Sequence, residues 1–309
     1  MMRRCFTAVV ILGLGGAAHC GQMKGSFPSN PYARAVYDGM VKAMRKATAL
    51  SWSADYRCAA GGKEFIRETY KIWLQKPNYA RMETYAPGTN ALIGRLVLDG
   101  STMWTYWPNG KPAYQWDLKG KRAAEFKVYN RKFYRGDPAP FGRHSIAHAA
   151  TDLGIGCMTV LDPSTFHGYT DSMQSYIDGV RFIADKRVGG EDCRGIEVSI
   201  MKGQRTWALW LSKKDQMPRR LEETVHVNND ICVNETWSNV KLNSPQDRKF
   251  FAWKPPKGWK QYVMPQIEEG LLSAGSIAPD IDLAGLDGGR VKLSDYRGKV
   301  VWLNKWRCG

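Results

Sequence analysis

The first long periodic segment of the chain repeats its apolar positions at helical spacing. Ser29-Asn30-Pro31 is a typical helix start, with a capping side chain before a proline at the first helical position. Five apolar residues then recur three or four positions apart: Tyr37, Met40, Val41, Met44 and Ala47. The pattern predicts an amphipathic helix over residues 31–47, whose apolar face must cover another apolar surface.

After this segment the period changes to two, which is typical of half-buried strands. Alternation predicts strands at 51–58, 66–74, 79–85, 95–98, 102–107 and 113–118. Asp99-Gly100 and Pro108-Asn109-Gly110 are turn signals between neighbouring strands. The apolar stripe of the second strand has one exception, Glu68. Short turns between successive strands predict an antiparallel meander.

The middle of the chain, residues 121–178, breaks this rhythm. Residues 121–132 fit either a helix or a strand, 137–140 indicate a loop, and 145–153 suggest a short helix. Strand patterns return at 180–187, 196–201, 205–211, 220–227 and 232–242. We therefore expect one mainly β domain with a leading helix over residues 29–252, an α+β fold with two meanders.

The N-terminus has the pattern of an export signal. Arg3 and Arg4 precede an apolar run, Phe6–Leu14, and small residues follow it. We expect residues 1–18 to be a signal peptide and the protein to be periplasmic or secreted. Lipid attachment at Cys20 is a weaker alternative, because His19 stands where a small residue is usual, and an uncleaved anchor is another.

Composition supports a folded, exported β protein. Hydrophobic residues make up 43% and charged residues 24%, which excludes wholesale disorder, and 12 Trp with 14 Tyr favour a sheet-rich fold.

The net charge of the chain is +16, and loss of residues 1–18 lowers it to +14, because only Arg3 and Arg4 are charged there. Export and the lack of a repeated basic-aromatic motif disfavour nucleic acid as a partner. An anionic envelope surface is one possible partner, and a basic surface without a dedicated partner is the plainer reading. The sequence indicates no oligomeric state.

The order of elements, together with two short motifs, resembles the outer-membrane lipoprotein carrier superfamily. The motifs are Leu209-Trp210-Leu211 and Met217-Pro218-Arg219-Arg220-Leu221, and an Asp-Gly turn stands before Trp104. The resemblance implies a curved, antiparallel, incomplete β-barrel with a helix lid. It also implies an apolar cavity that receives a hydrophobic ligand, such as a lipid or the acyl chain of a lipoprotein. It points to binding and not to catalysis, and it implies no cofactor.

The strands supply candidates for the inner wall of such a cavity. They are Trp52, Tyr56, Tyr70, Ile72, Met82, Leu96, Leu98, Trp104 and Tyr106. The alternative is that these side chains fill a closed core. A further alternative for the whole domain is a platform for protein interactions that binds no ligand.

The cysteines and histidines give few candidates for chemistry. Four cysteines lie in the main domain and allow three pairings; we favour Cys193–Cys232, because each opens a strand-like run. No two cysteines are spaced Cys-x-x-Cys, so a zinc knuckle is unsupported. His144 and His148 would share a helical face, but two ligands are half a metal site, and we predict no metal.

The C-terminal residues, 275–309, follow a segment that we expect to be a linker, 253–274. Three groups carry a resemblance to the opening of the redoxin superfamily: Ala278-Pro279-Asp280, Leu286-Asp287-Gly288 and Leu293-Ser294-Asp295-Tyr296. That superfamily includes thiol–disulfide oxidoreductases and the alkyl hydroperoxide reductase/thiol-specific antioxidant peroxiredoxins. The resemblance implies an unfinished thioredoxin-like α/β fragment, with residues 300–303 as its first central strand. In the family that strand leads to a Cys-x-x-Cys.

Here the sequence departs from the family pattern. Cys308 follows Trp306 by two positions, closer than the family's first cysteine, and no second cysteine follows it. Cys308 is therefore the one catalytic candidate, out of register and unpaired. We expect this chain to lack redox activity, and a full-length relative to be a thiol–disulfide oxidoreductase.

Overall fold

The structure is a computed structural model that describes residues 25–111, 125–132, 165–166, 174–263, 272–285 and 288–302. Several predictions fall outside these residues: the signal peptide, Cys20, the strand at 113–118, His144, His148, Cys157 and Cys308. The chain divides into a large unit, Gln22–Met264, and a second unit that contains Pro265–Gly309. Each unit is described by itself.

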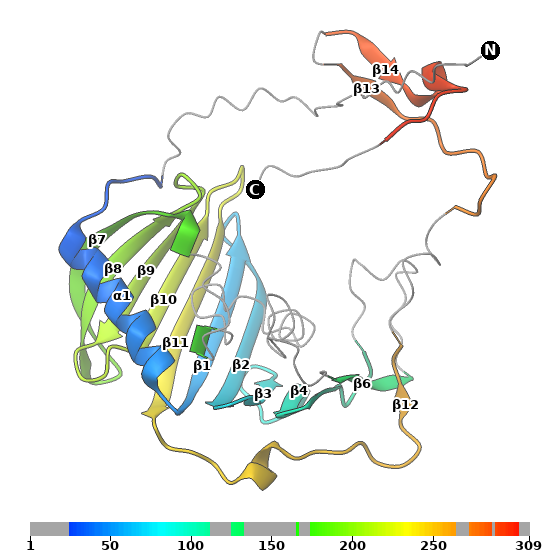
Figure 1. The fold of residues 1–309 in the computed structure, drawn as a ribbon. Coiled ribbons are helices and arrows are strands. Elements are labelled where there is room, and N and C mark those ends of the chain that lie inside the picture. Colours follow the sequence, from blue (N-terminus) through cyan, green and yellow to red (C-terminus); the bar gives the residue numbers. More distant parts are fainter. Residues whose placement is uncertain are drawn as a thin grey trace, which may run out of the picture. The chain divides into compact units, whose positions relative to one another are not determined.

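Helix α1 (Pro31–Lys46) confirms the helix that the sequence predicts. The Asn30 side chain caps it, since its Oδ1 accepts hydrogen bonds from the backbone N–H groups of Tyr32 and Ala33 at 2.9 and 3.1 Å. Its buried residues are Ala33, Tyr37, Met40, Val41 and Met44. The apolar face packs against β7 and β8, and the helix crosses the sheet there (Figure 1).

The large unit is built on one twelve-stranded sheet, ordered β12-β6-β5-β4-β3-β2-β1-β11-β10-β9-β8-β7. The strands of the first half are β1 (Ala49–Ala60), β2 (Lys63–Gln75), β3 (Tyr79–Tyr85), β4 (Leu92–Asp99), β5 (Thr102–Tyr106) and β6 (Phe126–Lys132). Those of the second half are β7 (Ile177–Val188), β8 (Glu191–Ile200), β9 (Arg205–Ser212), β10 (Pro218–Val225), β11 (Ile231–Leu242) and β12 (Lys260–Gln261). A 3₁₀ turn, η1 (Gln174–Tyr176), precedes β7.

This topology joins two meanders through one antiparallel pair, β1 with β11. The two edge strands, β12 and β7, stand at opposite ends of the order, so the curved sheet is open and not a closed barrel (Figure 1). The prediction of a mainly β domain with a large, open, curved sheet is therefore confirmed.

One face of the sheet, here called the inner face, carries buried apolar side chains of β1–β5 and β7–β11 and shares its core with α1. Because directly paired residues in antiparallel strands point to the same face, the register defines it. One row across β1 to β5 reads Trp52, Ile72, Met82, Leu96 and Thr105.

The opposite face, here called the outer face, is covered beside β3–β5 by the segment 248–262. This segment begins with η2 (Arg248–Phe251), and Phe250 lies edge-on to Trp73 with ring centroids 5.1 Å apart. It ends in β12, which pairs in parallel with β6 and forms that edge of the sheet. Residues 253–263, which we expected to belong to a linker, thus pack on the sheet.

Trp104 and Tyr106 were predicted on the inner wall, and that prediction is wrong. On β5 the buried positions are Met103 and Thr105, so the two aromatic rings point to the outer face. Trp104 lies 5.8 Å from Trp253, and Tyr106 stacks on Trp259 at 4.7 Å. Both faces of this strand are covered by apolar side chains, so alternation in the sequence does not distinguish the inner from the outer face.

The predicted disulfide Cys193–Cys232 is also wrong, because Cys58, Cys193 and Cys232 are free. Cys193 lies on β8 and Cys232 on β11, with β9 and β10 between them, which is roughly 14 Å of sheet. The two cysteines also lie at different heights along the strands. The row of paired residues that contains Cys232 reaches β8 at Ser199, near one end of that strand, and Cys193 lies near the other end. A disulfide needs Cα atoms within about 7 Å. Burial raises the pKa of the Cys193 thiol, which keeps it in its unreactive form.

The second unit contains a two-stranded sheet, β13 (Asp282–Ala284) with β14 (Arg290–Lys292), and the 3₁₀ turn η4 (Leu293–Tyr296). Asp280 of the Ala-Pro-Asp motif joins them: its carboxylate accepts from the backbone N–H and the hydroxyl of Ser294, each at 2.9 Å. None of the described residues from 272 onward is buried. Residues 300–302, expected in a central strand, are not in a strand, and Trp302 is 81% exposed.

Candidate functional site

Seven of the nine predicted wall residues lie together on the inner face of β1–β4. They are Trp52, Tyr56, Tyr70, Ile72, Met82, Leu96 and Leu98, each 3% exposed or less. Burial at this level fits a ligand cavity and a closed core equally well. The polar side chains among them separate the two interpretations.

Three glutamates interrupt the apolar stripes of the inner face: Glu68 on β2, Glu223 on β10 and Glu235 on β11. Glu235, Tyr56 and Glu68 occupy one row across β11, β1 and β2. Glu223 lies in the next row, on the far side of Val233. Glu223 and Glu235 are only 4% exposed. Burying a carboxylate is costly unless a cation or several donors compensate it.

Glu223 has such compensation. Its Oε1 accepts hydrogen bonds from Arg205 Nη1 and Trp207 Nε1, both at 3.0 Å. The Arg205 side chain is 31% exposed, so its charge is partly solvated while it pairs with the buried carboxylate. This glutamate has a structural role, tying β9 to β10.

The buried carboxylate of Glu235 has much less compensation. It accepts hydrogen bonds from Trp237 Nε1, at 3.0 Å, and from the Tyr70 hydroxyl, and no cation of the described residues pairs with it. Desolvation by burial raises the pKa of Glu235 to about 7, and the nearby Glu223 carboxylate adds to the shift. The side chain therefore changes its charge close to neutral pH.

Glu68 is the second uncompensated carboxyl. It is partly buried, its Oε2 lacks a hydrogen-bond partner among the described residues, and burial raises its pKa to about 7. No lysine, arginine or histidine of the described residues forms an ion pair with Glu68 or Glu235. The inner face of β11, β1 and β2 thus carries two carboxyls that hold a proton easily.

Two donors lie beside Glu235. Trp52 stacks on Trp237 with ring centroids 4.2 Å apart and planes inclined by 13°. Tyr70 is one register row away, and burial together with the charge of Glu235 raises its pKa well above the ordinary value. The Tyr70 hydroxyl forms hydrogen bonds with Glu235, Trp52 and Trp237, so these four side chains form one polar group in the apolar wall.

Three buried polar atoms of the inner face have no hydrogen-bond partner among the described residues. They are Glu68 Oε2, Thr84 Oγ1 and Thr105 Oγ1. Closed cores satisfy nearly all of their buried polar groups, because each unmet group costs about 1–3 kcal/mol.

The Met217–Leu221 motif has a different role. The Arg219 guanidinium is 5% exposed, and its Nη2 contacts Asp215 at 2.8 Å and Glu191 at 3.0 Å. Ser212 donates a further hydrogen bond to Glu191 at 2.6 Å. These contacts link the β9–β10 turn to the start of β8, so the motif stabilises the hairpin.

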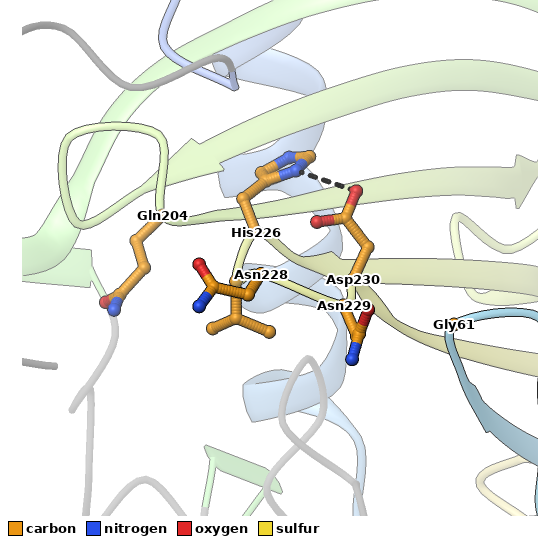
Figure 2. A pocket seen from close by; sticks show the side chains of 7 residues that line it. Gly61, Gln204, His226, Asn228, Asn229 and Asp230 are labelled. Atoms are coloured by element: carbon orange, nitrogen blue, oxygen red, sulfur yellow. Dashed lines mark ion pairs between the residues drawn. The ribbon is translucent and has the colours of Figure 1, made fainter.

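A second, polar hollow lies at the rim of the sheet, where the β1–β2, β8–β9 and β10–β11 turns meet (Figure 2). His226 points toward Asp230, with Nδ1 at 3.5 Å from the carboxylate, and its Nε2 lies 3.3 Å from Thr206 Oγ1. The other lining residues are Gly61, Gln204, Val227, Asn228 and Asn229. Among the described residues that line this hollow, no nucleophile lies beside the histidine. The hollow is therefore a weaker candidate for a functional site than the inner face.

Sequence reasoning identified the apolar wall but assigned no role to the glutamates on it. Glu68 was noted as an exception in its stripe, and Glu235 breaks the stripe of Val233 and Trp237 in the same way. A single acidic residue at an inward position of an apolar strand is therefore the signal. Among the described residues, no helix is long and apolar enough to cross a membrane, and no three His, Cys, Asp or Glu side chains gather as metal ligands.

Residues 128–262 match a family described as a predicted periplasmic protein, DUF2092. The match covers the second meander and the segment that packs on the outer face. It confirms the periplasmic location that the N-terminal pattern predicts.

A curated relative is the thiol-disulfide oxidoreductase ResA of Geobacillus thermodenitrificans, 43% identical over 49 residues, or 16% of this chain and 28% of ResA. ResA of Geobacillus kaustophilus is 45% identical over the same length. The chain thus spans little more than a quarter of the curated relatives that it matches.

Solved structures with a related arrangement share little sequence with the chain. A LolA superfamily protein from Nitrosomonas europaea is 9% identical, with a TM-score of 0.31 over 72% of this chain and 97% of its own. The lipoprotein LppX of Mycobacterium tuberculosis is 11% identical, with a TM-score of 0.37 over 71% and 99%.

Proposed function

We propose that this protein is a periplasmic binding protein that holds a hydrophobic ligand against the inner face of its curved sheet. The observation that carries the proposal is the set of buried polar atoms without partners among the described residues, Glu68 Oε2, Thr84 Oγ1 and Thr105 Oγ1, on an otherwise apolar wall. An apolar lining with a few convergent polar groups is the usual chemistry of a small-molecule site. The ligand is a lipid or an acyl chain, because the wall that surrounds the polar atoms is wide and aliphatic or aromatic.

Native mass spectrometry of the protein purified from the periplasm tests this proposal. We expect masses above that of the polypeptide, and organic extraction should release the bound lipid. Titration of the emptied protein with a fluorescent fatty alcohol should then give saturable binding. A polypeptide mass alone, together with no saturable binding of the probe, would contradict the proposal.

A control variant distinguishes the inner face from adventitious hydrophobic binding. Ala54→Leu adds a side chain to the inner face between Trp237 and Tyr70, where Ala54 is 1% exposed. We expect weaker probe binding. Trp302→Ala removes one of the most exposed apolar side chains of the second unit and should leave probe binding unchanged.

For the second unit we propose a different function, and the ResA match supports it. Residues 275–309 would belong to a redoxin module, and the full-length product would join ligand binding to thiol–disulfide exchange. An insulin-reduction assay, with Cys308→Ser as the control, tests whether this chain has such activity. We expect none, and activity that Cys308→Ser abolishes would overturn this expectation.

A further inference from the structure

A surface on the outer face combines aromatic rings with exposed lysines. Four rings from β5 and from the segment 248–262 contact one another there, and each is only half-buried: Trp104, Tyr106, Trp253 and Trp259. Tyr106 stacks on Trp259 with ring centroids 4.7 Å apart, and its centroid lies 5.7 Å from that of Trp253. The four rings thus form one aromatic surface that is separate from the inner face.

Three lysines flank the two tryptophans of this segment in the sequence. The side chains of Lys254, Lys257 and Lys260 are exposed. The loop between the tryptophans extends into solvent, since a Cβ added at Gly258 would meet nothing within 4 Å. The ammonium of Lys260 lies over the Phe126 ring, 4.7 Å from its centroid, so charge and rings share one surface. We call the four rings and the three lysines the aromatic–lysine patch.

The patch is strongly positive. Residues 248–262 carry no Asp or Glu and five basic residues: Arg248, Lys249, Lys254, Lys257 and Lys260. On the neighbouring strands β3 and β4, the buried carboxylate of Glu83 pairs with both Arg81 and Arg95, each at 2.7 Å, so that cluster adds no net negative charge. A surface with this charge complements an anionic partner.

The residue types favour a lipid surface over an acidic protein. Lysine is depleted in protein–protein interfaces and arginine is enriched there, because the planar arginine fork matches a carboxylate. A lysine is a flexible point charge, which suits the spread charge of many phosphates. Tryptophan and tyrosine rings are typical of the membrane–water boundary, because each has an apolar body and one polar group. Such rings with lysines around them are the composition of a membrane-surface site.

We propose that the aromatic–lysine patch docks this protein on the surface of an anionic phospholipid membrane. The rings lie at the level of the headgroups, and the ammonium groups of Lys254, Lys257 and Lys260 contact the phosphates. The patch lies at the end of the sheet that β6 and β12 form (Figure 1). Because docking uses the outer face, it does not depend on the ligand proposed for the inner face.

Two kinds of sucrose-loaded vesicle test the docking: phosphatidylcholine alone, and phosphatidylcholine mixed equally with phosphatidylglycerol. The protein purified from the periplasm is mixed with each kind and sedimented, at about 0.1 M and about 1 M salt. At the lower salt we expect at least about tenfold stronger partition into the anionic vesicles than into the neutral ones. At the higher salt this preference should disappear, because the screening length falls to about 3 Å.

A pair of triple variants locates the effect. The patch variant replaces its three lysines by glutamine: Lys254→Gln, Lys257→Gln and Lys260→Gln. The matched control removes the same charge from exposed lysines elsewhere: Lys42→Gln, Lys63→Gln and Lys214→Gln. The patch variant should lose at least about tenfold in partition into anionic vesicles, since one lysine near such a surface contributes about fivefold. The control should stay within about threefold of the wild type, because exposed charges farther away than the screening length contribute little.

The remaining outcomes overturn the proposal. They are no binding to either vesicle, equal binding to both, and equal losses in the two triple variants. Retention on immobilised polyglutamate without vesicle binding would overturn it in favour of an acidic protein as the partner. A lipid on the inner face of a protein that does not dock leaves the proposed function intact, and docking of a protein that carries no lipid leaves the patch intact.

Discussion

Two glutamates on opposite faces of the same sheet, Glu83 and Glu235, are buried to almost the same extent, 5% and 4% exposed. On the outer face, Glu83 Oε1 accepts from Arg81 and from Arg95, each at 2.7 Å, and Tyr85 donates to Oε2. On the inner face, Glu235 has two neutral donors, the Trp237 indole and the Tyr70 hydroxyl. The outer face supplies cations to its buried carboxylate, whereas the described residues of the inner face supply none.

The pKa values of the two carboxyls move in opposite directions for this reason. Burial alone would raise the pKa of Glu83, but the hydrogen bonds of Tyr85 and Arg81 and the charges of both arginines outweigh it and lower the pKa. Burial raises the pKa of Glu235 to about 7, because the hydrogen bonds of Trp237 and Tyr70 do not offset it. A buried carboxylate with cationic partners is thus held charged on the outer face, and one without them is held close to its neutral form on the inner face.

The largest effect is expected from removing Glu83. Glu83→Ala leaves Arg81 and Arg95 without their shared carboxylate and should lower the free energy of unfolding by about 3–4 kcal/mol. Urea denaturation followed by tryptophan fluorescence measures the change. Glu222→Ala, which breaks the more exposed pair with Arg220, is the control, with less than about 1 kcal/mol lost. Equal losses from both substitutions would show that the Glu83 cluster is no stronger than a surface ion pair.

The second effect concerns pH. The folded state keeps the Glu235 proton up to about pH 7, while the unfolded chain releases it near its ordinary value of 4.5. Between these values the folded state binds more protons, so the free energy of unfolding falls as pH rises, by about 3 kcal/mol for this group. Burial also raises the pKa of Glu68 to about 7, so this group adds to the same fall in the free energy of unfolding.

Glu235→Gln should remove the Glu235 part of this slope and leave the part due to Glu68. Denaturation of the emptied protein at pH 5, 6, 7 and 8 measures it, and at pH 8 the variant should be more stable than the wild type. A wild-type stability that does not fall between pH 5 and 8 would contradict the assignment of an uncompensated carboxyl at Glu235.

The smallest effect compares two threonines of neighbouring strands. Thr84 on the inner face is fully buried and its hydroxyl has no partner among the described residues, so Thr84→Val should stabilise the emptied protein by up to about 1 kcal/mol. On the outer face, Thr69 donates to Asp55 at 3.1 Å, and Thr69→Val should cost about 0.5 kcal/mol. Opposite signs in urea denaturation support the contrast between the faces, and a loss of stability in both variants would argue against it.

The sequence alone predicted the fold of the large unit well. Strand β3 has the predicted bounds, and α1 ends one residue before the prediction. Period-two and period-3.6 patterns are set by which positions are buried, and the inner face is apolar along almost its whole length. What the sequence could not give was the face on which each aromatic lies where both faces are covered, as Trp104 and Tyr106 show.

The candidate site was predicted only in its apolar part. The row that brings Glu235 beside Tyr56 and Glu68 comes from the pairing of β11 with β1, whose residues are far apart in the sequence. The distance between Cys193 and Cys232 is also set by the order of the strands. Their two strand patterns suggested a disulfide, but β9 and β10 lie between the strands that carry them. Local patterns report burial, whereas the neighbours of a buried group depend on the order of the strands.

Photoaffinity labelling tests most directly whether the inner face is the binding site. A twelve-carbon alcohol with a diazirine in its chain is bound to the protein, irradiated, and mapped by peptide mass spectrometry. We predict labels on the peptides that contain Trp52, Ile72 and Glu235, and loss of these labels when unlabelled dodecanol competes. Labels confined to the exposed apolar residues of the second unit or to the outer face around Trp253, with the inner-face peptides unmodified, would contradict the account.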